Sequence, residues 1–325
     1  MRIAMLVVLL GLIAPPAWTA TMQDYADCMK ITSDDAQIST CSRVIEDKAT
    51  PNYERAMATY NRGVAYEATG AYNEALADFN EVLRGQPIAV VYANRGLVYQ
   101  RLRNYPRSID DLNEALRLDP SLSSAYKWRG VSNFNISENE RALADFTAAI
   151  RLDPKDSEPY WQRAQVYEVT QNLKGALADY TDMLQREPKS VRGLIRRATV
   201  RIALGDPDHA LADASDAMYI EPRNAGALVV RGNAYRAKND FKRAIDDYTA
   251  AIAFDPHAQF FHERGVTYRM KGDRAHAIDD FKYAVHLLPK DMPDSIAELK
   301  KLGVDMSDYD PMKLPKAKDM LNSLK

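Results

Sequence analysis

The sequence has little of what catalytic and metal sites use. Only two cysteines and five histidines occur among 325 residues. His257 and His262 stand five residues apart, which is not a metal-binding spacing on one helix face. The sequence contains no His-Glu-x-x-His motif, no glycine-rich phosphate loop and no Gly-x-Ser-x-Gly elbow. We therefore expect no catalytic residue, no metal and no cofactor, so that the chain is not an enzyme.

The chain also lacks an excess of charge of either sign. The chain has 43 Lys and Arg against 45 Asp and Glu, a net charge of −2. Broad nucleic-acid binding needs a clustered basic excess, so we expect no nucleic-acid partner. With only 14 Gly and 16 Pro, long disordered linkers are not expected either.

Long apolar runs are absent after residues 3–14. Arg2 precedes that run, and small residues follow it up to Ala20, which is typical of a secretory signal peptide. The run is too short to span a bilayer. We expect cleavage after Ala20 and an exported protein, periplasmic or secreted and not membrane-spanning. The alternative is a buried N-terminal helix.

What the sequence does have is a stretch of about 34 residues that recurs seven times. In the copy that ends at Pro256, the spacing of apolar residues predicts helices at Ala225–Lys238 and Phe241–Ala253. Gly232 lies mid-helix, where a small residue allows two helices to approach closely. A repeat of this period predicts a helical array. An Arg followed by a small residue marks the seven copies, at Arg62, Arg95, Arg129, Arg163, Arg197, Arg231 and Arg264.

The repeated pattern is an aromatic, a small residue and Tyr, then Ala, an aromatic, Ala and Pro. Over about Ala56–Pro289 it resembles the tetratricopeptide repeat (TPR) family, here of an exported bacterial type. The resemblance implies an all-α, right-handed superhelical α-solenoid of helix-turn-helix repeats whose first helices line a concave groove. It also implies that the groove binds a protein or peptide. We expect a signal peptide at 1–20, a degenerate repeat at 21–55, seven repeats at 56–289, and a capping helix and tail at 290–325.

Both cysteines lie in the degenerate repeat. Alignment with the first clear repeat places Cys41 in the slot of Phe79 and Cys28 in the slot of Tyr66, two slots that face the interior of a helix pair. In an oxidising compartment such a pair is expected to form a disulfide. Closing this loop would contribute about 3 kcal/mol in the chain-entropy model. The alternative is two free thiols in a small core.

One further regularity departs from the common family pattern. All seven repeats have Arg before the small residue and Asp before the position that the family fills with the aromatic of the second helix. We interpret these residues as a structural ladder of ion pairs, since the planar guanidinium binds carboxylates bidentately. The sequence leaves open whether each pair forms within a repeat or across to the next. The aspartates are Asp78, Asp111, Asp145, Asp179, Asp213, Asp247 and Asp280.

The resemblance also names candidate partner-binding residues on the first helices. In some family members Lys, Arg and Asn side chains grip a chain-terminal carboxylate. Lys127, Arg192 and Arg196 match part of that clamp, so the resemblance implies a partner with an acidic or C-terminal carboxylate group. Glu158 and Glu168 are near enough in sequence to neutralise it. The alternative is that these residues only pack the inner wall. The candidates are Lys127, Trp128, Phe134, Trp161, Gln162, Gln165, Arg192, Arg196, Asn233 and Arg236.

Three functions follow from these observations. The first is a non-enzymatic, exported scaffold that binds a peptide or protein partner in its groove. The second is a structural component of an envelope complex that docks through its outer faces or its C-terminal tail, residues 304–325. An enzyme is the remote third.

Overall fold

The described residues of the computed structural model are 20–30, 35–288 and 292–304. The predicted signal peptide, apart from Ala20, and nearly all of the predicted tail lie outside them. Helices and turns make up the described residues, without a strand. The all-α fold is therefore as expected. None of the described helices combines the length and the apolar character that crossing a membrane requires.

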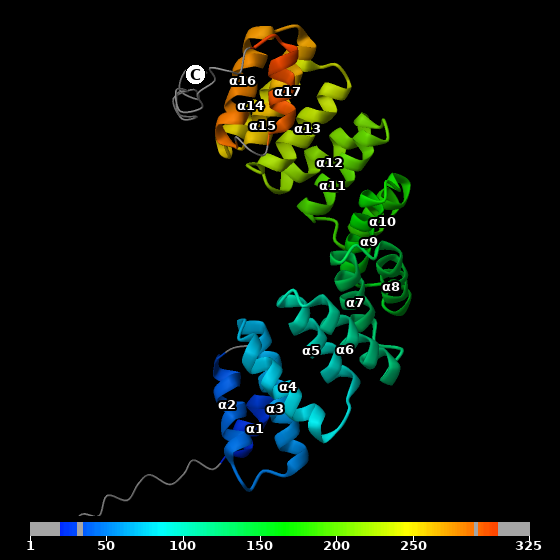
Figure 1. Cartoon of the computed structure of the whole chain (residues 1–325), viewed down its shortest axis with the longest axis vertical. Coiled ribbons are helices and arrows are strands. Elements are labelled where there is room, and N and C mark those ends of the chain that lie inside the picture. Colours follow the sequence, from blue (N-terminus) through cyan, green and yellow to red (C-terminus); the bar gives the residue numbers. More distant parts are fainter. Residues whose placement is uncertain (1–19, 31–34, 289–291, 305–325) are drawn as a thin grey trace, which may run out of the picture. The chain divides into compact units, whose positions relative to one another are not determined.

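Within the described residues, seventeen helices follow one another, all but the last in pairs (Figure 1). The first pair is the degenerate repeat, the next seven pairs are repeats one to seven, and the last helix stands alone. The helices are α1 (Met22–Met29), α2 (Asp35–Glu46), α3 (Asn52–Thr69), α4 (Tyr72–Gly85), α5 (Ala89–Arg101), α6 (Tyr105–Leu118), α7 (Ser123–Asn135), α8 (Asn139–Leu152), α9 (Glu158–Val169), α10 (Leu173–Arg186), α11 (Val191–Ala203), α12 (Pro207–Ile220), α13 (Ala225–Ala237), α14 (Phe241–Phe254), α15 (Ala258–Lys271), α16 (Arg274–Leu287) and α17 (Pro293–Lys301).

The chain divides into two compact units, one up to Asp153 and one from Pro154. In the first unit, which holds α1 to α8, successive helices pack on each other, and α5 contacts both α3 and α7. In the second unit, which holds α9 to α17, successive helices pack in the same way, and α13 contacts both α11 and α15. Each unit is thus a stretch of solenoid in which first helices touch first helices.

Helix α3 starts earlier than expected. The sequence places the start of repeat one at Ala56, whereas the helix begins at Asn52. Pro51 is the N-cap residue, with φ −57° and ψ 149°. The fixed φ of proline and its missing N–H suit a helix start, which accounts for the extra turn.

In four repeats the small residue is a glycine that packs against the aromatic of the second helix. A Cβ built on Gly63 would lie 2.7 Å from Phe79, and one on Gly232 would lie 2.8 Å from Tyr248. Such distances are shorter than a carbon contact allows. The predicted close approach is therefore confirmed, and the ring that needs the space is identified.

The Arg–Asp ladder forms within each repeat. In all seven pairs Nη2 lies 2.6–2.8 Å from Oδ1 of the Asp sixteen residues later. Nε donates to Oδ2 of the same carboxylate at 2.7–3.0 Å. In several repeats Nη1 reaches back to the preceding helix pair, as where Arg95 donates to Asn80 at 2.6 Å and Arg129 donates to Asn113 at 2.7 Å. Each arginine thus closes its own repeat and in these cases also ties it to the one before.

The degenerate repeat closes the N-terminal end of the first unit. The structure joins Cys28 and Cys41 in the predicted disulfide, with Cα atoms 4.8 Å apart and both side chains fully buried. Ser42, the residue after Cys41, accepts from Arg62 Nη1 at 3.1 Å. Ser42 therefore accepts a hydrogen bond from the ladder arginine of repeat one, as Asn80 does from that of repeat two. This equivalence supports the alignment of Cys41 with the aromatic slot.

Helix α17 packs against the last repeat. Its Leu299 is fully buried, and Ile296 and Leu302 pack on the cluster that contains Phe281. The helix begins at Pro293 and ends at Lys301. Terminal repeats of a solenoid need such a cover because they have a neighbour on one side only.

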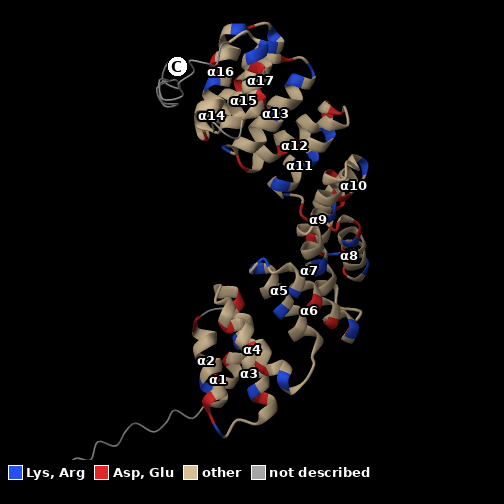
Figure 2. Ribbon diagram, viewed as in Figure 1, with Lys and Arg blue, Asp and Glu red and all other residues tan. Residues whose placement is uncertain are grey.

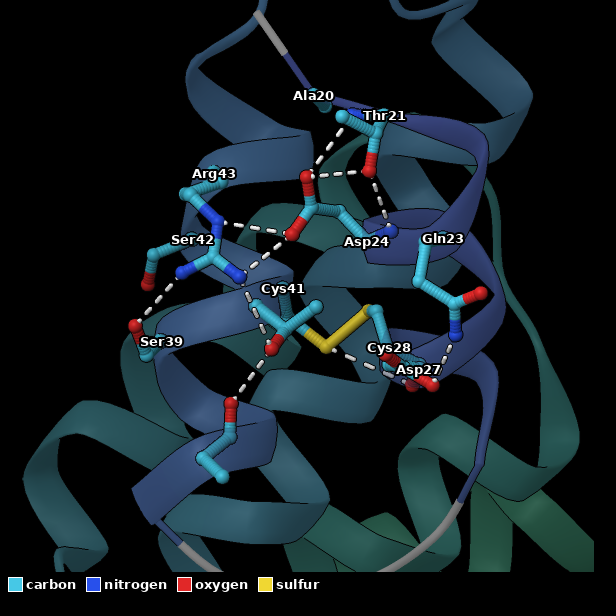
Figure 3. A network of polar contacts seen from close by, with 12 residues as sticks. Ala20, Thr21, Gln23, Asp24, Asp27, Cys28, Ser39, Cys41, Ser42 and Arg43 are labelled. Atoms are coloured by element: carbon cyan, nitrogen blue, oxygen red, sulfur yellow. Dashed lines mark hydrogen bonds and ion pairs between the residues drawn. A yellow bond between two sulfur atoms is a disulfide. The ribbon is translucent and has the colours of Figure 1, made fainter. Parts of the chain in front are cut away.

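A polar network ties α1 to α2 beside the disulfide (Figure 3). Thr21 caps α1, and its backbone N–H donates to Asp24 Oδ2 at 2.9 Å. Arg43 donates to Asp24 Oδ1 through Nε at 2.9 Å and through Nη2 at 2.5 Å. The Thr21 N–H first, and then the Arg43 guanidinium, lower the pKa of Asp24 from 3.8 to about 2.

The ladder should be least tolerant of change where it is most buried. Arg264 and Asp280 are each 1% exposed, whereas Arg62 is 20% and Asp78 is 8% exposed. Asp280→Asn leaves a buried guanidinium without its counter-charge, and we expect a loss of about 3–5 kcal/mol of stability. The matched control Asp78→Asn should lose about 1 kcal/mol, because Arg62 stays in contact with water. Thermal unfolding measures both; equal losses would contradict this account.

The Asp24 network predicts acid sensitivity of the N-terminal pair. A carboxylate whose pKa is lowered in the folded state stabilises that state above its unfolded pKa of 3.8 and loses this effect as the pH falls toward 2. Asp24→Asn should therefore be less stable than the wild type by about 1 kcal/mol near neutral pH, and the difference should vanish at low pH. Unfolding curves at several pH values test this. A stability difference that does not change with pH would mean that the substitution acts through side-chain shape and not through the charge of Asp24.

Candidate binding surface on the first helices

The predicted partner-binding residues are divided between the two units. Lys127, Trp128 and Phe134 lie on α7 in the first unit, and the other seven lie on α9, α11 and α13 in the second. The clamp residue Lys127 therefore belongs to a different unit from Arg192 and Arg196. Figure 2 shows basic and acidic residues interspersed over the helices of both units.

In the second unit, α9 and α11 meet through Trp161 and Arg192. The Arg192 guanidinium carbon lies 4.6 Å from the centre of the Trp161 ring, a cation–π contact. Arg192 Nη2 also lies 2.8 Å from Glu158 Oε2, and both side chains are more than one-third exposed. The other carboxylate oxygen of Glu158 accepts from Gln162 at 2.8 Å. Gln165 in turn donates to Gln162 at 3.4 Å.

One turn further along α11, Arg196 is also paired. Its Nη2 lies 2.9 Å from Glu168 Oε2, and the hydroxyl of Tyr180 donates to the other oxygen of Glu168. Burial first, and then the bond to the Glu168 carboxylate, raise the pKa of Tyr180 well above its usual range. Tyr180 thus stays a neutral donor, and its ring lies 5.5 Å from that of Trp161. The residues of α9, α10 and α11 form one connected cluster.

Further along the second unit, the two remaining candidates hold helices together. Asn233 accepts from the hydroxyl of Tyr248 at 2.6 Å. Arg236 Nη1 lies 2.7 Å from Glu263 Oε2 on α15, and both side chains are about one-fifth exposed. Their contacts make these residues part of the wall between repeats six and seven.

The candidates of the first unit are half-buried on α7. Trp128 packs on the cluster that contains Leu112 and Leu116. Its carbonyl accepts from Gln100 of the preceding first helix at 2.7 Å. For Trp128 the packing interpretation therefore accounts for much of the side chain, while Lys127 and Phe134 leave part of their surface open.

The charges of the α9–α11 cluster balance. Arg192 and Arg196 face Glu158 and Glu168, so the site carries no net charge. An incoming carboxylate must displace a glutamate. The Arg192–Glu158 pair is the easier one to open, because exposed ion pairs contribute only about 0–1 kcal/mol.

Sequence reasoning missed the part that Tyr180 plays in this surface. The aromatic slot of the second helix is Phe in repeats one, three and seven, and Tyr in repeats four and six. Both tyrosine hydroxyls bond a first-helix side chain, Glu168 for Tyr180 and Asn233 for Tyr248. A Tyr in place of Phe was the available signal, since a buried hydroxyl needs a partner.

No group of three or more His, Cys, Asp or Glu side chains among the described residues is placed to hold a metal ion. The described acidic residues of the surface are paired with arginines instead.

Comparison with known structures supports the fold. A tetratricopeptide repeat protein from Parabacteroides merdae is 21% identical, with a TM-score of 0.56 over 76% of this chain and 98% of its own. The C-terminal part of a TPR repeat-containing protein from Cytophaga hutchinsonii is 16% identical, with a TM-score of 0.60 over 74% of this chain and 99% of its own. PilF of Pseudomonas aeruginosa is 15% identical, with a TM-score of 0.54 over 66% of this chain and 96% of its own. At these identities the likeness shows the fold alone.

Among curated proteins, none matches this sequence. Sequence models described as tetratricopeptide repeat match residues 43–87, 89–122, 134–191 and 225–258, together more than half of the chain. The matched segments fall on the helix pairs described above. The chain therefore belongs to the tetratricopeptide repeat family.

Proposed function

We propose that this protein is an exported, non-enzymatic scaffold that binds a peptide or protein segment on its first-helix surface. The observation that carries the proposal is the Trp161–Arg192 contact on α9 and α11. An indole ring lies under a guanidinium that is about half exposed. Trp and Arg are enriched at the energetic centres of protein interfaces. Membership of the TPR family supports protein binding as the general role.

The chemistry of the surface favours a partner segment with an acidic side chain or a free C-terminus. Arg192 and Arg196 stand one helical turn apart on α11, so both can face one carboxylate. Arg binds a carboxylate bidentately, which Lys cannot do. The exposed Glu158 would give way to the ligand, while Tyr180 holds Glu168 in place. The indole of Trp161 offers an apolar wall beside the anion.

The binding test uses peptides with free C-termini, selected on the wild-type protein and then compared with their amidated forms. Arg192→Ala/Arg196→Ala should bind about tenfold more weakly or worse, and binding by the wild type should weaken with salt. Glu158→Gln should bind acidic peptides more tightly, because the internal competitor is gone. Arg117→Ala, at an exposed ion pair with Glu114 on α6, is the matched control and should change nothing.

Two results separate the possible failures. If the double Arg variant binds as well as the wild type but Trp161→Ala does not, the proposed recognition of a carboxylate is wrong. Binding on the first-helix surface would still be supported. If Trp161→Ala also binds normally and deletion of residues 304–325 abolishes partner capture, groove binding is wrong. The protein would then act as an assembly component of an envelope complex that docks through its C-terminal tail.

Export rests on the N-terminal sequence together with the disulfide, which is a bond typical of oxidising compartments. Cleavage after Ala20 would leave α1 whole, because this helix starts at Met22. We expect mass spectrometry of protein from the native cell to find Thr21 as the first residue. Thiol alkylation should occur only after reduction. Recovery of the chain with Met1 and free thiols from the cytosol would contradict export.

A further inference from the structure

The position four residues after the ladder arginine, called here the tyrosine slot, makes similar packing contacts in most repeats. Its ring packs against the residue eight positions later, on the second helix. The Tyr99 ring centre lies 5.7 Å from the Arg107 guanidinium carbon, and that of Tyr235 lies 4.7 Å from Arg243. In repeats one, four and seven the ladder arginine also lies over the ring, at 5.8–5.9 Å. The slot residues are Tyr66, Tyr99, Asn133, Tyr167, Arg201, Tyr235 and Tyr268.

Two repeats lack the ring, and they differ in what replaces it. In repeat five Arg201 takes the slot and donates through Nη1 to the ladder Asp213 at 2.6 Å and to the His209 carbonyl at 3.1 Å. The longer charged side chain therefore occupies the place of the ring. In repeat three Asn133 is much shorter than Tyr, and its amide turns inward to Asp145 at 2.9 Å.

A hollow of about 450 Å³ lies in repeat three at this slot. It opens between α6, α7 and α8, entirely within the first unit. Arg141, eight positions after Asn133, corresponds to Arg107 and Arg243. Its side chain is 72% exposed, and its ion-pair partner Glu138 is 3.7 Å away. The hollow is lined by Ile109, Asn113, Arg129, Asn133, Arg141, Ala144 and Asp145.

We propose that this hollow is a second binding site, which takes the aromatic ring of a tyrosine presented by a partner protein. Repeats two and six show what fits, since their own tyrosine rings, Tyr99 and Tyr235, lie against the equivalent arginines, Arg107 and Arg243. Arg141 supplies the cation that faces the ring, and Ile109 and Ala144 supply apolar wall. The space is sufficient, because a cavity of about 150 Å³ already accepts benzene. The site is independent of the first-helix surface on α9 and α11.

The first experiment titrates the full chain with p-cresol, the side-chain analogue of tyrosine, followed by NMR chemical shifts. The wild type should bind it saturably. Asn133→Tyr fills the hollow with the residue that other repeats use, and should bind about tenfold more weakly or not at all. Arg141→Ala, a change at an exposed position, should weaken binding several-fold. Tyr99→Asn should open an equivalent hollow beside Arg107 and add a second binding event.

A second experiment identifies the occupant, using an acetylated Gly-Tyr-Gly amide and its Gly-Leu-Gly counterpart. Binding of the tyrosine peptide that Asn133→Tyr removes supports the proposal. Binding of p-cresol but not of the peptide would mean that the hollow accepts only a free small molecule. That result would overturn the proposal that a partner protein docks a tyrosine there. The proposal is also overturned if the wild type shows no saturable binding, or if Asn133→Tyr and Arg141→Ala bind like the wild type.

Discussion

The bidentate Arg–Asp pair is the interaction on which the solenoid depends. It joins the two helices of a repeat across sixteen residues, while the third guanidinium nitrogen reaches the preceding pair where Arg95 meets Asn80. A guanidinium has donors for both jobs at once, and an ammonium group has no such planar fork. The last pair is the most buried of the seven, since Arg264 and Asp280 are each 1% exposed. The ladder therefore fixes the geometry within repeats and also links them.

Packing restricts which residues can occupy the positions next to the ladder. Packing of the glycine against the aromatic leaves no room for a Cβ in four repeats, and in five repeats an arginine lies over the ring in the tyrosine slot. Variation at these positions changes the interior directly. Asn133 and Arg201 show two outcomes of the same loss, an open hollow in one repeat and an additional ion pair in the other.

The sequence was sufficient to predict the period, the helix pairs and the disulfide, because each depends on local pattern or on alignment between repeats. It was not sufficient for the direction of the ladder, since Arg95 can reach an Asp in its own repeat or a neighbour with equal plausibility on spacing alone. The start of α3 was missed because Asn52 and Tyr53 lie outside the repeated pattern. The pairing of Arg192 with Glu158 depends on side-chain rotamers, which spacing does not determine.

The same distinction applies to binding. A residue that recurs in every repeat is occupied by the interactions that build the repeat, as Asp145 is by Arg129 and Asn133. Free binding capacity must therefore come from positions that vary between repeats. Trp161 and Arg192 are such positions on the first helices, and Asn133 is one between α7 and α8. In a protein made of repeats that share their structural positions, the departures from the repeat are consequently where recognition of one partner over another can arise.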